Sequence, residues 1–269
     1  MLFCFGTDDS NNSGAKIMNQ IIRLLMERKS VRSYMPQEIP EEIVQEILIA
    51  STQAPTAGNQ QLYTILRVSD PEKKHRLSIS CDNQPFIEDA KLVLVYCADC
   101  LKWYTAFKEA GCEPRTLGEG DLMLAVCDAL IAAQNAVVAA QSYGIGSCYI
   151  GDIMENVEEQ REILGLPHFV FPVAMLVFGY PTKQQMERKK PRRAELKYIV
   201  HTDQYHELSA RELEEMLSVN IGRQSYSTWL KAFCDRKYNS DFAKEMTRSV
   251  REYLKDLGNC ETRSASFQS

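Results

Sequence analysis

Lys91-Leu92-Val93-Leu94-Val95-Tyr96-Cys97 is the segment around which the predicted fold is built. The five residues between Lys91 and Cys97 are apolar or aromatic, a run typical of a strand buried on both faces of a sheet. Similar runs predict further strands at residues 62–68, 147–150 and 170–178, with 196–201 as a last strand. The sequence therefore predicts a sheet with a buried middle strand.

Helical periodicity occupies most of the remaining chain. Apolar residues recur at helical spacing over residues 17–28, 41–51, 119–143, 157–164 and 241–257. Residues 119–143 are small and apolar nearly all round, which predicts a helix buried in the core or at a dimer interface. The apolar stripe of 241–257 must be buried in its own subunit or in a neighbouring one. Strands separated by helices, followed by a helical tail, indicate an α+β or α/β layered domain.

Composition limits the function classes. The chain has 269 residues, 45% of them hydrophobic, and a formal net charge of −5, which suits a globular protein with a large core and disfavours nucleic acid as the main partner. No apolar run reaches the roughly 20 residues that span a bilayer. The N-terminus lacks the basic start of a signal peptide, so we expect a cytoplasmic protein. Residues 1–15 are predicted to be a polar leader and 260–269 a loose tail.

Nine cysteines without an export signal favour a reducing compartment, where thiols stay free. Cys97 and Cys100 have the spacing of a redox pair or of half a zinc site. No second pair completes a ligand set, so we predict no metal site and interpret Cys97 as part of a buried strand.

Two basic runs suggest an anion site built from side chains. Arg28-Lys29-Ser30-Val31-Arg32 lies early in the chain and Lys190-Pro191-Arg192 far downstream. Arginine forks, lysine point charges and a serine hydroxyl all suit phosphate oxygens. The alternative is that both runs are solvated surface segments.

Residues 55–61, Pro55-Thr56-Ala57-Gly58-Asn59-Gln60-Gln61, combine small residues with three carboxamides. Carboxamides donate and accept hydrogen bonds at once, which suits the edge of a flavin or purine, although a plain polar turn has the same composition. Gly144 and Gly146 lack the third glycine of a dinucleotide-binding turn and follow a helix, and no P-loop run exists.

Taken in order, these motifs resemble the flavin-dependent nitroreductase family, and most of all its larger, NADPH-preferring branch with an extended helical C-terminus. The resemblance covers about residues 17–205. It rests on the two basic runs, residues 55–61 and an ordered set of further stretches: Asn83-Gln84-Pro85, residues 89–99, 144–151, Val200-His201 and Tyr205. It implies an α+β fold with a mainly antiparallel sheet, an FMN-binding domain over residues 16–206 and a helical extension of that domain over 207–259.

The resemblance also implies an FMN at a homodimer interface. Arg28, Lys29, Ser30 and Arg32 are expected to hold its phosphate and ribityl chain, with Lys190 and Arg192 closing over the phosphate side or the polar edge of the ring. Side chains of Thr56, Gln61, Asn83 and Gln84 are expected to line the flavin, some of them from the second subunit. Backbone N–H groups near Tyr149, Ile150 and Gly151 are expected to face N5 and O4 of the ring.

The implied reaction is two-step hydride transfer from NADPH or NADH through flavin N5 to a nitroaromatic, quinone or flavin acceptor. No catalytic side chain is assigned, and His201 is interpreted as structural. Arg223 is a candidate contact for the 2′-phosphate of NADPH. The alternatives are a specialised flavin reductase, dehalogenase or desaturase on the same scaffold, a non-catalytic FMN-binding or storage protein, and a binding domain without flavin.

Overall fold

The computed structural model describes residues 19–257, so the predicted leader and tail lie outside the described residues. Its strands are β1 (Tyr63–Arg67), β2 (Leu92–Asp99), β3 (Gly146–Ile150) and β4 (Val170–Gly179). Its α-helices are α1 (Gln20–Glu27), α2 (Glu41–Thr52), α3 (Pro71–Ser80), α4 (Phe86–Asp89), α5 (Leu101–Glu109), α6 (Glu119–Ser142), α7 (Val157–Leu164), α8 (Lys183–Glu187), α9 (Ala210–Leu217), α10 (Tyr226–Lys237) and α11 (Asp241–Leu257). Short 3₁₀ helices are η1 (Ala57–Asn59), η2 (Asp152–Met154), η3 (Leu196–Tyr198) and η4 (Ser218–Asn220).

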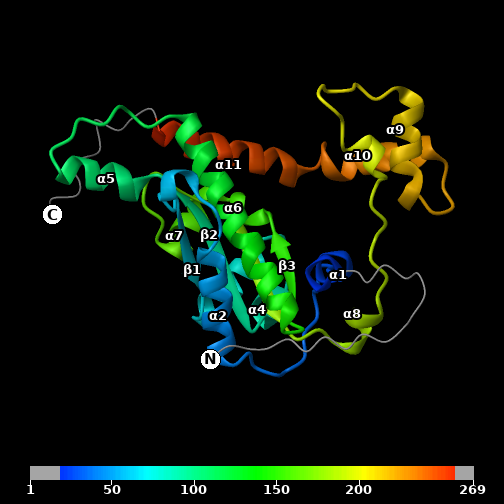
Figure 1. The fold of residues 1–269 in the computed structure, drawn as a ribbon, viewed down its shortest axis with the longest axis horizontal. Coiled ribbons are helices and arrows are strands. Elements are labelled where there is room, and N and C mark those ends of the chain that lie inside the picture. The colour runs from blue at the N-terminus through cyan, green and yellow to red at the C-terminus, as the bar shows by residue number, and fades with distance from the viewer. Residues whose placement is uncertain (1–18, 258–269) are drawn as a thin grey trace, which may run out of the picture.

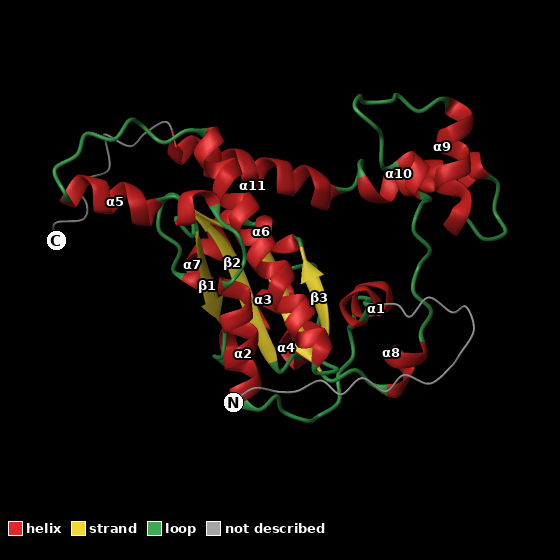
Figure 2. Cartoon of the chain, in the orientation of Figure 1, coloured by secondary structure: helices red, strands yellow, loops and turns green. Residues whose placement is uncertain are grey.

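The four strands form one sheet in the order β1-β2-β4-β3, and every neighbouring pair is antiparallel (Figure 2). β2 is buried along its whole length, as its apolar run predicts. β4, its central partner, is also buried throughout. The mainly antiparallel α+β sheet expected from the sequence is therefore confirmed.

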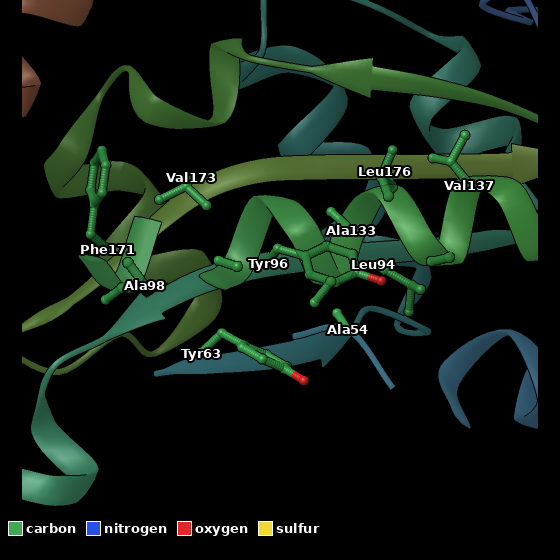
Figure 3. Packing of buried hydrophobic residues seen from close by; sticks show 14 of the residues in the cluster. Ala54, Tyr63, Leu94, Tyr96, Ala98, Ala133, Val137, Phe171, Val173 and Leu176 are labelled. Atoms are coloured by element: carbon green, nitrogen blue, oxygen red, sulfur yellow. The ribbon is translucent and has the colours of Figure 1, made fainter. Parts of the chain in front are cut away.

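Two apolar layers enclose this sheet. On one face Leu94 and Tyr96 of β2 pack with α2 and with the small residues of α6, such as Ala133 (Figure 3). On the other face Val93 and Val95 pack against α3, α4 and α7. Alternation along β2 thus divides its side chains between two cores, as the two-residue period of a strand requires.

The C-terminal helix α11 joins the core of its own chain. Its Tyr253 and Leu257 are buried with the sheet residues, and the Tyr253 ring meets Phe171 of β4 with centroids 4.6 Å apart. α9 and α10 instead project from the body on an extended connection (Figure 1). The apolar stripe predicted for residues 241–257 is thus buried at its C-terminal end within the same subunit.

The prediction of a last strand at residues 196–201 is wrong. Residues 196–198 form η3, and the neighbouring Ile199 and Val200 are 66% and 62% exposed. Among the described residues they take part in no strand pair or bridge, so an apolar run alone does not make a strand here. Only Tyr198 is buried, and its hydroxyl donates to Glu215 of α9 at 2.8 Å.

Candidate functional site

The first basic run, residues 28–32, is attached to the outer strand of the sheet. It follows α1 directly, and Ser30 forms a parallel bridge with Ser147 of β3. The N–H of Val31 donates to the Ser147 carbonyl at 2.9 Å. This close approach needs a glycine opposite, because a Cβ on Gly146 would lie 2.5 Å from Val31 Cγ2. The sheet therefore fixes the position of the basic run.

Cationic side chains from both basic runs gather here. Lys29 Nζ donates to the carbonyls of Met186 and Arg188, each at 2.5 Å, and Lys190 Nζ donates to the Met26 carbonyl at 2.9 Å. Burial and the nearby Arg193 and Arg28 lower the pKa of Lys190. The structure thus joins segments about 160 residues apart in sequence.

Arg28 shows that this cluster suits an anion. Its Nη1 atom is buried and has no hydrogen-bond partner among the described residues. A buried, unpaired guanidinium donor is costly unless a ligand satisfies it, and a phosphate oxygen has the matching geometry. Arg188, which the sequence analysis missed, donates to the Ser30 carbonyl. Its place just after the short helix α8 and two residues before the second basic run was the signal that could have identified it.

The free edge of β3 supplies backbone donors. Ser147 directs its carbonyl to Val31, on the side away from β4. In a strand the N–H and C=O of one residue point to the same edge and those of the next residue to the other. The N–H groups of Tyr149 and Gly151 therefore face this free edge, whereas that of Ile150 faces β4.

Asn83 and Gln84 lie on the same side of the molecule. Gln84 Nε2 donates to Asp152 Oδ2 at 2.6 Å, just after β3, and to the Cys81 carbonyl at 2.7 Å. Arg32 lies over the ring of Phe86, 5.9 Å from its centroid. Asn83 is exposed and has a left-handed backbone, with φ of 51°. These contacts bring the segment from Asn83 to Phe86 next to Arg32 and to Asp152, just after β3.

The segment 55–61 forms a strained loop. Gly58, Asn59 and Gln61 all have positive φ, at 56°, 57° and 50°. For Gln61, which has a Cβ, this conformation costs about 1 kcal/mol. The Thr56 hydroxyl accepts from the Gln61 N–H at 2.8 Å and donates to Asp128 of α6. Additional interactions must therefore hold this loop in place.

Within a single subunit, the loop 55–61 lies apart from the basic cluster. Asp128, which holds the loop, and Gln141, which lines a cavity of about 450 Å³ beside Lys29 and Lys190, lie on the same helix. Gln141 follows Asp128 by about 20 Å along the helix axis and by about 220° around it. Figure 1 accordingly shows α2 and α1 on opposite sides of α6. Thr56 and Gln61 therefore belong to a different face from the other candidate residues.

Other predicted residues fall outside these two groups. Arg223 is exposed in the turn between η4 and α10, on the projecting segment. Cys97 and Cys100 are buried and free, and burial raises the pKa of each thiol to about 12, which leaves little thiolate for redox chemistry. His201 Nδ1 accepts from the His206 N–H at 3.0 Å, a structural contact.

Among the described residues one helix, α6, is long and apolar enough to cross a membrane by composition. Core helices of soluble proteins pass the same test, and the residues of α6 fill the core beneath the sheet. The helix is thus weak evidence for a membrane span.

Similarity to known proteins agrees with this geometry. The nitroreductase family matches residues 25–180. An FMN reductase (NADPH) of Bacillus subtilis is 31% identical over 245 residues, with 85% of this chain and 98% of the relative covered. A nitroreductase structure from B. subtilis superposes with a TM-score of 0.72 at 28% identity, covering 84% of this chain and 98% of that one. The NADPH:FMN oxidoreductase of Vibrio harveyi, solved in complex with NAD⁺, superposes with a TM-score of 0.71 at 26% identity, covering 89% of this chain and 98% of that one. The chain belongs to the nitroreductase family.

Proposed function

We propose that this protein is an FMN-dependent NAD(P)H oxidoreductase that works as a homodimer in the cytoplasm. The observation that carries the proposal is the buried, unpartnered Nη1 of Arg28, set among cations from two distant segments beside the donor edge of β3. This arrangement suits a ligand with a phosphate at one end and hydrogen-bond acceptors at the other. The names of the Bacillus and Vibrio relatives agree with FMN as that ligand.

The candidate residues take complementary parts in binding. Arg28, Ser30 and Arg32, with Lys190 and Arg192 of the second run, would hold the phosphate and ribityl chain. Lys29 would add charge while bracing α8 through its two carbonyl contacts. For the ring, the strand geometry favours the N–H groups of Tyr149 and Gly151 as donors and leaves Ile150 a packing role. Asn83 and Gln84 would contact the same ring.

Bound FMN would supply the redox chemistry that couples oxidation of NAD(P)H to reduction of an acceptor. The chain's own part is electrostatic and positional. Fixed cations and backbone dipoles stabilise negative charge that develops near them, without having to reorganise. Nitroaromatics, quinones and free flavins are the acceptor classes that an exposed ring would accept, since a shallow site discriminates weakly by shape.

A second copy of the chain would complete the site. Thr56 and Gln61 lie on the opposite side of α6 from the basic cluster, so they reach a flavin only if it belongs to a partner subunit. α1 exposes Ile21, Ile22, Leu25 and Met26, and α6 exposes Met123, Leu124, Leu130 and Ile131. Apolar surface of this extent is characteristic of an interface. We propose that these faces form the dimer contact, with residues 16–206 as the binding domain and 207–259 as its extension.

The test is an anaerobic visible spectrum of the purified protein before and after NADPH. Yellow absorbance that bleaches on addition of NADPH is expected. Yellow that persists would instead favour the FMN-storage alternative, and absence of colour after FMN is supplied would contradict the proposal. Acceptor screening of the reduced protein then separates a general nitroreductase from a specialised flavin reductase, dehalogenase or desaturase.

A further inference from the structure

Asp128 is an acidic residue on the buried face of the apolar helix α6. Its side chain belongs to the core side of the helix and the residue is only 3% exposed. The ion pairs of the described residues do not include it. A buried carboxylate without a cation needs hydrogen-bond donors to replace water.

Among the described residues, the groups that donate hydrogen bonds to Asp128 all belong to the loop 56–62. The Thr56 hydroxyl and the Leu62 N–H, the latter at 3.2 Å, donate to Asp128 Oδ2. The Ala57 N–H donates to Oδ1 at 3.2 Å. One carboxylate thus binds both ends of the loop that contains the three left-handed residues.

This pattern differs from ordinary core packing. A methyl or methylene group at position 128 would fill the space with less desolvation, so an acid here serves to direct donors. Asn135, about two turns further along the helix, makes one side-chain hydrogen bond within the described part of the chain, from Nδ2 to the Ala50 carbonyl at 3.2 Å. Among the hydrogen bonds of residues 19–257, those that tie α6 to the backbone of the loop all end on Asp128.

We propose that Asp128 is a positioning residue for the cofactor site of the partner subunit: it holds the loop 56–62 in the conformation that places Thr56 and Gln61 against the partner's flavin. This inference rests on the proposed function. It adds a residue that touches neither cofactor nor substrate and acts through the loop.

Single substitutions first test the hydrogen bonds between Asp128 and the loop 56–62. Asp128→Asn keeps the volume but turns an amide N–H toward the Leu62 or Ala57 donor, so the FMN dissociation constant is expected to rise at least about tenfold. Thr56→Val, which removes the hydroxyl that donates to Asp128, should raise the dissociation constant as well, and Thr56→Ser, which keeps the hydroxyl, should raise it less. Asn135→Ala, the matched control in the same helix, should leave FMN affinity unchanged.

Hybrid dimers test whether Asp128 acts across the interface. Arg28→Ala and Asp128→Asn chains carrying different affinity tags are coexpressed and purified through both tags, and bound FMN is counted at a concentration that fills only unimpaired sites. With the substitutions on different chains, one site has both defects and the other has neither, so one tight site per dimer is expected. With both substitutions on one chain and a wild-type partner, each site has one defect and no tight site is expected.

A merely structural role for Asp128 would not reproduce this pattern, since a poorly folded chain impairs its dimer in either arrangement. The reverse pattern would show that Asp128 serves its own chain's site, and would overturn the inference. Wild-type FMN affinity in Asp128→Asn would do the same. Failure of the wild-type protein to bind FMN would overturn the proposed function itself, which the unsubstituted dimer reports separately.

Discussion

Ser249 of α11 accepts a hydrogen bond from the backbone N–H of Val157, the first residue of α7, at 3.1 Å and across 92 residues of sequence. The Ser249 hydroxyl also donates to Glu245, which accepts from the N–H of Asn156. Asn156 has a left-handed backbone and makes no side-chain cap of its own. The C-terminal helix therefore supplies the N-terminal cap of α7.

Ser249→Ala is expected to lower the free energy of unfolding by about 1–2 kcal/mol, because it leaves the buried Val157 N–H without a partner. Urea unfolding followed by circular dichroism measures this change. Thr247→Ala, on the exposed side of the same helix, is the control and should change stability by less than about 0.5 kcal/mol. Equal losses in the two variants would argue against the cap.

Glu155 is expected to make stability depend on pH. Burial, and then the negative charges of Asp152, Asp82 and Glu245, raise its pKa from 4.5 to about 7. Between pH 4.5 and about 7 the Glu155 carboxyl loses its proton in the unfolded chain and keeps it in the folded chain. The free energy of unfolding therefore falls as the pH rises through this range, and the loss is complete above the folded pKa. Glu155→Gln should therefore stabilise the protein at pH 8, by roughly 1–2 kcal/mol after screening is allowed for, and have little effect at pH 4.5. Thermal melts of both proteins at the two pH values measure this, and an equal gain at both would contradict the assignment.

Gly146→Ala is expected to displace the basic run from β3. The new Cβ would meet Val31 Cγ2 at 2.5 Å and Val31 Cβ at 2.8 Å, and the resulting strain should cost about 1–3 kcal/mol. FMN affinity should fall with it, as titration of the quenching of FMN fluorescence would show. Adding Val31→Ala should restore part of the loss, so the two changes together cost less than their sum. Gly120→Ala, at an open position in the first turn of α6, is the control.

Arg28→Ala should weaken FMN binding by about 1.5–3 kcal/mol, or roughly 10-fold to 100-fold, because it removes a charge-assisted contact to phosphate. Adding Arg192→Ala should weaken it further. Riboflavin, which has no phosphate, provides the control ligand: its affinity should respond much less. Full retention of FMN by the double variant would exclude the phosphate assignment.

Arg223→Ala should raise the KM for NADPH and leave that for NADH nearly unchanged, since only NADPH carries a 2′-phosphate. Steady-state kinetics with each donor and a fixed acceptor measure the two values. An unchanged KM for NADPH would remove Arg223 from the site.

The sequence was sufficient where local pattern determines structure. The run from Leu92 to Tyr96 predicted the buried strand, and the helical periodicity of residues 41–51 predicted α2, which spans Glu41–Thr52. Residues 196–201 misled because an apolar run carries no information on whether a partner strand is available. Their apolar side chains lie on the surface of the chain instead.

The candidate site was predicted less completely, because its contacts are distant in sequence. Asp128 lies inside the predicted helix 119–143 with no local motif around it, and its loop partners lie 66 to 72 residues earlier. The contact from Arg188 to Ser30 spans 158 residues. Residue type identified the cations of the two basic runs, whereas only the fold added Arg188 and divided the candidates between the two sides of α6.

The cap that α11 places on α7 has a consequence for synthesis. Tyr253 and Leu257 are the last core residues described, and they pack against strands and helices completed long before them in the chain. A nascent chain that has reached only residue 240 still lacks this helix, so the end of α7 and the adjacent sheet surface remain open to solvent. We therefore expect a stop codon before α11 to yield a product that exposes this apolar surface and aggregates.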